Sequence, residues 1–162
     1  MKMLYAVRHA KSSWDAPDQD DFDRPLNERG EKDAPRMGKQ LKERDVVPDL
    51  IYASPAARAW ATAVAIAHIL GYDVNNIRKE RKLYHAGEDI LLETVRHTSD
   101  TIDSIMIVGH NPGLTEFVND LLNENISNIS TAGVVAAQLK IDSWNKADWK
   151  CGKLLFFDYP KK

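Results

Sequence analysis

Short apolar runs alternate with helix-like segments along most of this chain, and this alternation is the strongest constraint on its fold. Apolar runs at 3–7, 49–53 and 104–109 predict buried strands, and a segment with helical spacing follows each of them. Strands that alternate with helices favour a parallel sheet with helices on both faces. The sequence therefore predicts an α/β fold, arranged as a three-layer α/β/α sandwich with a mostly parallel central sheet.

The other predicted elements extend the same pattern. Pro35 should kink the first helix or lie near its true start, because proline disrupts a helix interior. The last two strands follow each other without a helix and predict a hairpin. With 162 residues and no internal repeat or low-complexity linker, the chain is expected to form a single domain, 1–162. We expect helices at 26–44, 56–70, 88–96 and 112–122, and further strands at 77–83, 133–141 and 154–159.

Composition excludes several classes of function. The net charge is -2, so no overall field directs the chain toward nucleic acid or an anionic membrane. Cys151 is the only cysteine, which excludes an internal disulfide framework and a cysteine-based zinc site. No apolar run approaches the ~20 residues of a membrane-spanning helix, and no leader is apparent after Met1. We expect a cytoplasmic protein with no nucleic-acid or membrane partner, and nothing in the sequence requires a particular oligomeric state.

Cationic and imidazole side chains stand at the carboxyl ends of three predicted strands. The first strand ends in Arg8-His9, the strand at 104–109 ends at His110, and the strand at 49–53 runs toward Arg58. Ligands of open α/β sheets bind beyond the carboxyl ends of the strands. Two arginines and two histidines are therefore predicted to meet at one edge of the sheet, where a phosphoryl group is the natural ligand.

Two of these segments also predict helix N-termini. Ser54 is a good N-cap and Pro55 a good first helical residue, and we expect Asn111 and Pro112 to play the same two parts. A helix N-terminus offers free amide groups and a partial positive charge, which both favour an anion.

Each of these residues also has a simpler explanation. A single arginine or histidine is usually a solvated or structural residue, and helix capping alone accounts for Ser-Pro and Asn-Pro. The other interpretation of His9 and His110 is a metal site. No carboxylate flanks them at ligand spacing, however, and two nearby arginines would repel a divalent cation. The coincidence at three strand ends favours the phosphate site.

The strand-end motifs resemble the signature of the histidine phosphatase (phosphoglycerate mutase-like) superfamily, over roughly residues 4–132. Ala10 stands where the wider superfamily usually has glycine, which is itself a trait of the SixA-type phosphohistidine phosphatases. The resemblance implies the phosphoglycerate mutase-like fold. The motifs that carry it are Arg8-His9-Ala10, Ser54-Pro55-Ala56-Ala57-Arg58-Ala59, Gly109-His110-Asn111-Pro112 and, for the SixA type, residues 7–14 with 23–30.

This resemblance implies a role for each of the four strand-end residues. His9 would be the nucleophile that accepts the phosphoryl group, giving a phosphohistidine intermediate that water then hydrolyses. Arg8 and Arg58 would grip the non-bridging oxygens, since the planar guanidinium matches phosphate geometry. His110 would donate a hydrogen bond to the phosphoryl group in the transition state. The resemblance implies no metal and no cofactor.

Four further residues are candidates for substrate binding: Ser12, Asp15, His85 and Asn111. Ser12 matches a serine that commonly contacts phosphate in this superfamily, and Asn111 follows the predicted catalytic His110. Mutase-like members have an asparagine at the place of Asp15. An ionised Asp15 would repel an anion, so we expect it to point away from the phosphate or to serve as a proton donor.

The glutamate that serves as general acid in mutases and phosphomonoesterases is missing. His85 occupies the comparable position, as a substitute acid or as a loop residue without a role. An alkoxide leaving group needs a proton, whereas the imidazole of a phosphohistidine leaves as a neutral ring when its other nitrogen is protonated. The missing glutamate therefore favours phosphoramidate substrates. The acidic loop at 15–23 is expected to be an ordinary solvated loop, with Arg24 pairing with it or supporting the pocket.

Three functional hypotheses follow. The leading one is a SixA-like phosphohistidine phosphatase acting on a phosphorelay or phosphotransfer protein. The second is a phosphomonoesterase for small phosphorylated substrates, with Asp15 or His85 as the acid. The third is a non-catalytic phosphate-binding module, which the presence of His9 disfavours because binding alone does not need that residue.

Overall fold

A computed structural model describes residues 1–161 and shows one six-stranded sheet with strand order β3-β2-β4-β1-β5-β6. Strands β1 to β4 run parallel to one another, whereas β5 is antiparallel to β1 and β6 is antiparallel to β5. The α/β fold and the mostly parallel sheet are confirmed. The strands are β1 (Lys2–Arg8), β2 (Leu50–Ala53), β3 (Arg78–Lys79), β4 (Ser104–Gly109), β5 (Val134–Leu139) and β6 (Gly152–Asp158).

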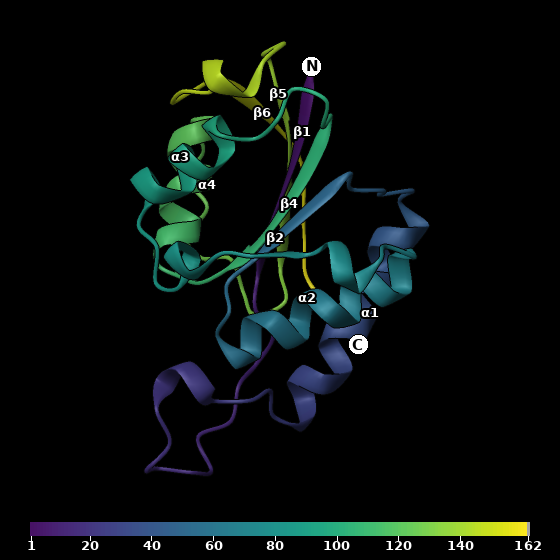
Figure 1. Cartoon of the computed structure of the whole chain (residues 1–162), viewed down its shortest axis with the longest axis vertical. Coiled ribbons are helices and arrows are strands. Elements are labelled where there is room, and N and C mark those ends of the chain that lie inside the picture. Colours follow the sequence, from purple (N-terminus) through teal and green to yellow (C-terminus); the bar gives the residue numbers. More distant parts are fainter. Residues whose placement is uncertain (162) are drawn as a thin grey trace.

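Four α-helices cover the two faces of this sheet (Figure 1). They are α1 (Glu28–Glu43), α2 (Ala57–Leu70), α3 (Glu88–Arg96) and α4 (Gly113–Leu122). Successive strand residues point to opposite faces, so Leu4 and Ile107 join the core under α3 and α4, whereas Val7 and Val108 join the core under α1 and α2. The result is the predicted three-layer sandwich. Within residues 1–161, no helix combines the length and apolar character that crossing a bilayer requires.

The predicted strand at 77–83 is mostly wrong. Only Arg78–Lys79 pairs with β2, and residues Arg81–Leu83 form a 3-10 helix instead. The segment Arg78-Lys79-Glu80-Arg81-Lys82 is charged throughout and lies at the edge of the sheet, so it lacks the apolar side chains that would bury it as a longer strand. Its short pairing leaves the following chain free to turn toward the carboxyl edge.

The first helix starts earlier than Pro35 and continues through it. Asn27 is its N-cap, and the Asn27 side chain accepts a hydrogen bond from the Gly30 amide at 2.8 Å. Pro35 therefore lies in the interior of α1, not near its start as one of the two expectations had it. Gly30 is required here because a Cβ at this position would collide with the Lys11 carbonyl, so the first turn of α1 packs directly on the loop after β1.

The two predicted helix caps are also wrong. Helices α2 and α4 begin at Ala57 and Gly113, with Ala56 and Pro112 as their N-cap residues. Ser54 and Asn111 each lie too early to be the N-cap. Their side chains still accept from backbone amides near the helix starts, Ser54 from Ala56 and Asn111 from Thr115, and they also make the contacts that build the pocket described below.

The carboxyl ends of β1, β2 and β4 meet at one edge of the sheet. Backbone bonds continue the pairing one residue beyond the strands, from the His9 amide to the Gly109 carbonyl at 3.1 Å and from the Ser54 amide to the Val108 carbonyl at 3.0 Å. The chain between β1 and α1 projects past this edge (Figure 1). The predicted strand-end residues therefore stand on a rigid base, beside a long connecting loop.

Candidate active site

A pocket of about 330 Å³ opens at this edge and contains all four strand-end residues, Arg8, His9, Arg58 and His110. The structure brings three of the four substrate-binding candidates to the same pocket and leaves Asp15 outside it. Thr131, ahead of β5, also lines this pocket. The remaining residues that line the pocket are Lys11, Ser12, Trp14, Asp21, Arg24, His85 and Asn111.

His9 is buried at the base of the pocket, with only 8% of its surface exposed. Its Nδ1 lies 2.7 Å from the Ala10 carbonyl. Because a carbonyl oxygen only accepts, Nδ1 carries the proton and Nε2 keeps a free lone pair. Burial and, to a smaller extent, the charges of Arg58 and Arg8 lower the pKa of His9 to about 4, although the hydrogen bond to the Ala10 carbonyl opposes this shift. His9 is therefore neutral near neutral pH, and its Nε2 has the free lone pair that a nucleophile requires.

His110 lies beside His9, with the two ring centroids 5.2 Å apart. Burial lowers the pKa of His110 to about 3, so this imidazole is also neutral near neutral pH. Its Nε2 lies 2.8 Å from the Ser54 hydroxyl oxygen, and this oxygen accepts a hydrogen bond from the Ala56 amide at 3.3 Å. Ser54 is fully buried, and among residues 1–161 its hydroxyl proton has no acceptor other than His110 Nε2.

Hydrogen-bond accounting therefore assigns the proton of neutral His110 to Nδ1. Ser54 donates to Nε2, which must then be the unprotonated nitrogen. Nδ1 is buried and has no partner within the part of the chain that the structure describes. An oxyanion in the pocket would supply the missing acceptor, which suits His110 as a neutral hydrogen-bond donor.

The two arginines are anchored differently. Arg8 donates from one terminal nitrogen to the Ile129 carbonyl at 2.9 Å. Arg58, on the first turn of α2, donates to the Asp21 carbonyl at 2.7 Å and to the Asp21 carboxylate at 2.9 Å. The Nε atoms of both arginines are buried without a hydrogen-bond partner among residues 1–161. Unsatisfied cationic donors around a neutral imidazole make this pocket suited to an oxyanion.

The Asn111 side chain supports the pocket by holding neighbouring segments in place. Its amide nitrogen donates to the Asn128 side chain at 2.9 Å and to the Ile129 carbonyl at 3.0 Å. Its side-chain oxygen accepts from the amide of Thr115 at 3.2 Å and from the Thr115 hydroxyl at 2.8 Å. Both amide protons of Asn111 are thus already used, and one of them holds the carbonyl to which Arg8 donates.

Arg24 organises the loop that follows β1. Its guanidinium is buried and lies over the Trp14 ring, 3.5 Å from the ring centroid. It donates to the Ser12 hydroxyl at 2.8 Å and to the Asp21 carboxylate at 3.1 Å. The sequence interpretation allowed Arg24 to support the pocket, and the structure shows how it does so. Trp14 itself is 76% exposed at the entrance.

Asp21 is the pocket residue that sequence reasoning missed, because the acidic loop was taken as solvated. Its Oδ2 accepts from Arg58, from the Tyr84 hydroxyl at 2.6 Å and from His85 Nε2 at 3.0 Å. Burial raises the pKa of Asp21, but the hydrogen bonds from Tyr84, Arg58 and His85 outweigh it and hold this pKa well below its usual range. The sequence did hold one signal for Asp21. Two arginines were predicted in one pocket, and buried guanidiniums need a negative counter-charge.

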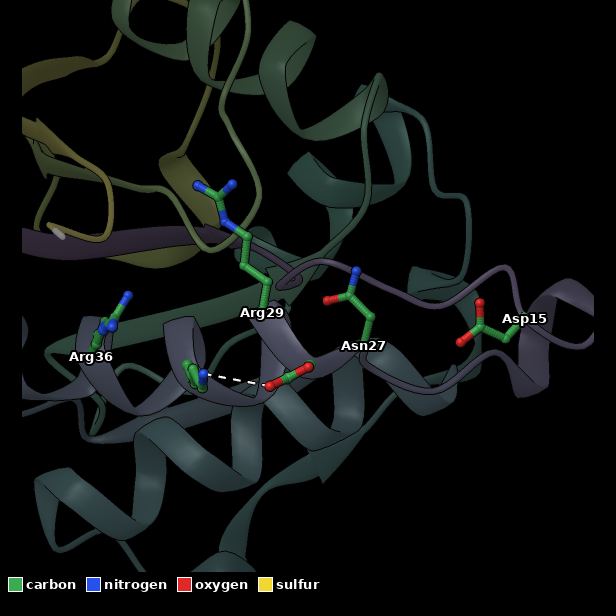
Figure 2. Close-up of a pocket in the computed structure, with 6 residues that line it drawn as sticks. Asp15, Asn27, Arg29 and Arg36 are labelled. Carbon is green, nitrogen blue, oxygen red and sulfur yellow. Dashed lines mark ion pairs between the residues drawn. The ribbon is translucent and has the colours of Figure 1, made fainter.

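Asp15 lies in a separate groove along the start of α1. Figure 2 shows it on the loop beyond Asn27, with Arg29 and Arg36 projecting from the helix. It is exposed and lines this groove together with Asn27, Glu28, Arg29, Lys32 and Arg36. The structure therefore does not bring Asp15 to the phosphate site. Of the two candidate acids, only His85 lies at the pocket.

Comparison with known proteins agrees with this geometry. The model of the histidine phosphatase superfamily (branch 1) matches residues 4–84, and the chain belongs to this superfamily. Within it the fold is of the SixA type: SixA from Agrobacterium tumefaciens superposes with a TM-score of 0.83 at 28% identity, covering 98% of this chain and 99% of that one. Family and site together support phosphatase activity.

Two further relatives define the range of similarity. A SixA structure complexed with tungstate has a TM-score of 0.83 at 20% identity, covering 98% of this chain and 97% of that one, and shows the shared fold. An uncharacterized chloroplastic protein of Arabidopsis thaliana is 29% identical over 154 residues, which is 90% of this chain and 70% of the relative.

Proposed function

We propose that this protein removes the phosphoryl group from phosphohistidine on a phosphorelay or phosphotransfer protein, through a covalent phosphohistidine intermediate at His9. The observation that carries the proposal is the state of His9. Its Nδ1 proton is bound to a backbone carbonyl, its Nε2 lone pair is free, and its pKa of about 4 keeps the ring neutral. Phosphate binding alone requires none of these properties.

The surrounding groups suit each stage of this reaction. In the first, His9 Nε2 attacks phosphorus while Arg8 and Arg58 neutralise the non-bridging oxygens. The Nδ1 proton of His110 stabilises the charge that develops on the phosphoryl group. In the second, water attacks the phosphohistidine at His9 and releases inorganic phosphate, which restores the free imidazole.

The shape of the pocket supports a substrate displayed on another protein. Its volume of about 330 Å³ holds a phosphoryl group and one ring, and its entrance is formed by the exposed residues Lys11, Trp14 and His85. An open entrance admits a side chain that projects from a partner surface. The similarity to SixA at 28% identity points to the same substrate class.

The decisive experiment is a comparison of substrates. The purified protein is assayed with a phosphohistidine-bearing phosphotransfer domain and with a panel of sugar phosphates and other monoesters. We expect kcat/KM for the phosphohistidine protein to exceed every monoester by at least about a hundredfold. Equal or faster turnover of a small monoester would favour the phosphomonoesterase instead. Phosphate binding without any turnover would favour the binding module.

A second measurement tests the intermediate directly. Mass spectrometry of protein quenched without acid during turnover should locate phosphate on His9. Phosphate on another residue, or on none during turnover, would contradict the assignment of His9 as the nucleophile.

A further inference from the structure

An ionised carboxylate in an oxyanion pocket needs an explanation. Asp21 carries a negative charge that repels a phosphate dianion, yet its carboxylate contacts Arg58, one of the two arginines expected to hold that phosphate. Arg24 and Arg58 together offset this charge. Orientation of Arg58 alone does not require so exposed a group: 39% of the Asp21 side chain is accessible at the pocket entrance.

The position of Asp21 relative to His9 suggests what else it does. His9 lies at the buried base, and in-line transfer places the leaving group on the opposite side of phosphorus, toward the entrance. His85 marks that entrance, with 53% of its side chain exposed, and its Nε2 contacts Asp21 at 3.0 Å. His110 lies between the base and the entrance: its ring centroid is 5.2 Å from that of His9 and 5.3 Å from that of His85. Asp21 is therefore on the leaving-group side.

Asp21 also has acceptor capacity left for a ligand. Its Oδ2 already receives three hydrogen bonds, whereas its Oδ1 receives one, from Arg24 Nε at 3.1 Å. A carboxylate oxygen accepts two hydrogen bonds readily. The free position on Oδ1 suits an N–H donor carried by the substrate and is unfavourable to an anionic alkoxide or phenoxide oxygen.

We propose that Asp21 is a specificity residue that accepts a hydrogen bond from the protonated imidazole ring of a phosphohistidine substrate. This inference rests on the proposed function and assigns the recognition of the leaving group to a named side chain. The carboxylate stabilises the substrate ring in its protonated form. Once the bond to phosphorus breaks, a protonated ring departs as a neutral imidazole. The same carboxylate disfavours ester substrates, whose leaving oxygen becomes negative.

The bond changes balance without a further reactant. The substrate ring takes a proton from solvent on the nitrogen that does not bear phosphorus, and this N–H donates to Asp21. His9 Nε2 forms a bond to phosphorus as the bond from phosphorus to the substrate ring nitrogen breaks. The electron pair of the broken bond returns to that ring nitrogen, so the product ring is neutral and keeps its N–H.

The groups that face Asp21 remain compatible with this role near neutral pH. Arg24 follows it in the loop, Arg58 approaches from α2, and Tyr84 and His85 approach from the segment before α3. Burial and the Asp21 charge both raise the pKa of the Tyr84 hydroxyl, so this group stays a donor. Every neighbour therefore stabilises the ionised form of Asp21.

The experiment compares wild type with Asp21→Asn on two substrates between pH 6 and 9. The substrates are a phosphohistidine peptide and p-nitrophenyl phosphate, whose leaving group has no N–H. We expect Asp21→Asn to lower kcat/KM for the peptide by about ten- to a hundredfold at alkaline pH, the range for a hydrogen bond to a charged group. The alkaline limb of kcat reports the pKa of the ring in the bound complex, and in Asp21→Asn it should move to lower pH because no carboxylate holds the ring proton. Turnover of p-nitrophenyl phosphate should stay equal or rise.

Asp23→Asn is the matched control, because Asp23 is an exposed carboxylate in the same turn. It should leave both substrates and both pH profiles within about twofold of wild type. Tyr84→Phe removes one donor to Asp21 but keeps its charge, so it should retain the substrate preference.

The outcomes separate the two proposals. A wild-type protein without preference for phosphohistidine overturns the proposed function. A wild type with that preference, together with an Asp21→Asn variant that keeps the same preference and pH profile, overturns only the role of Asp21. An equal loss on both substrates at every pH would show that Asp21 acts by holding Arg58, and would also overturn the inference.

Discussion

The base and the entrance of the pocket are built in different ways. The base consists of Arg8 at the end of β1, His9 and His110 directly after β1 and β4, and Arg58 on the first turn of α2. Their side chains are held by backbone carbonyls and, for His110, by the buried Ser54 hydroxyl. The entrance consists of Lys11, Trp14, Asp21 and His85, which lie on connecting segments and are exposed or partly exposed.

From this difference we expect the base to carry out phosphoryl transfer and the entrance to select the substrate. Arg8, His9 and His110 are placed by the sheet, whose parallel register leaves little freedom at the strand ends, and Arg58 is placed by the first turn of α2. Residues at the entrance are placed by side-chain contacts, above all those of Arg24 with Trp14 and Asp21. Changes at the base should therefore stop phosphoryl transfer on every substrate, whereas changes at the entrance should alter which substrate is used.

His9→Ala should have the largest effect. Loss of the nucleophile should lower kcat by at least about a thousandfold on phosphohistidine and monoester substrates alike. Steady-state assays of both substrate classes measure this loss, and circular dichroism checks that the variant is folded. Activity retained within tenfold would show that His9 is not the nucleophile.

Arg58→Lys should rank second. Lysine keeps the charge but lacks the planar fork that Arg58 presents from α2, so transition-state binding should weaken by about a hundredfold. The loss should appear on both substrate classes. If only one class were affected, Arg58 would belong functionally to the entrance, and the division into base and entrance would fail.

Ser54→Ala should have a smaller effect on the base. Without the Ser54 hydroxyl, His110 loses the bond that holds its proton on Nδ1, and kcat should fall by about tenfold. KM should change little, because Ser54 does not line the pocket. Ser54→Thr keeps a hydroxyl and serves as the control: it should recover most of the activity if that hydroxyl is the cause.

The base should also make stability depend on pH. His9 and His110 have folded-state pKa values of about 4 and about 3, below the ordinary 6.5, so the unfolded chain binds more protons as the pH falls below 6.5. The free energy of unfolding should therefore decrease from pH 6.5 toward about 3. Asp21 has a lowered pKa in the folded state, so its contribution to the free energy of unfolding is lost only as the pH falls below its ordinary pKa of 3.8.

Urea unfolding at a series of pH values measures this dependence. The double variant His9→Gln/His110→Gln should have a flatter profile between pH 6.5 and 4. His68→Gln, at an exposed position on α2, is the control and should keep the wild-type slope. An unchanged slope in the double variant would contradict the neutral, buried state of the two imidazoles.

Asp15→Asn should have the smallest effect. Asp15 lies in the groove beside α1 (Figure 2), outside the phosphate pocket, so kcat and KM should stay within about twofold of wild type. A loss comparable to that of Asp21→Asn would restore Asp15 as the acid considered from the sequence and would extend the entrance along α1.

Much of the base was predictable because it depends on local patterns and one topological rule. Apolar runs located β1, β2 and β4, and parallel strands bring their carboxyl ends to one edge. The resemblance to the histidine phosphatases then supplied roles for Arg8, His9, Arg58 and His110. The helix caps were less predictable, because the Ser54 and Asn111 side chains bond both to an amide near the start of the next helix and to distant partners.

The entrance was not predictable in the same way. Asp15 and Asp21 belong to one acidic loop, and no periodicity distinguishes them. What separates them is the approach of Arg58 from α2 and of Tyr84 and His85 from the segment before α3, which are 37, 63 and 64 residues away from Asp21 in sequence. Such contacts depend on how the loop packs.

The sequence by itself therefore determined the α/β fold and the group of residues at the base, because strand periodicity and parallel pairing place strand ends without reference to side-chain detail. Only the tertiary structure decided the state of the two imidazoles, the placement of Asp15 outside the pocket and the position of Asp21 inside it. These depend on burial and on hydrogen bonds between residues far apart in the chain, and neither is written in any local pattern.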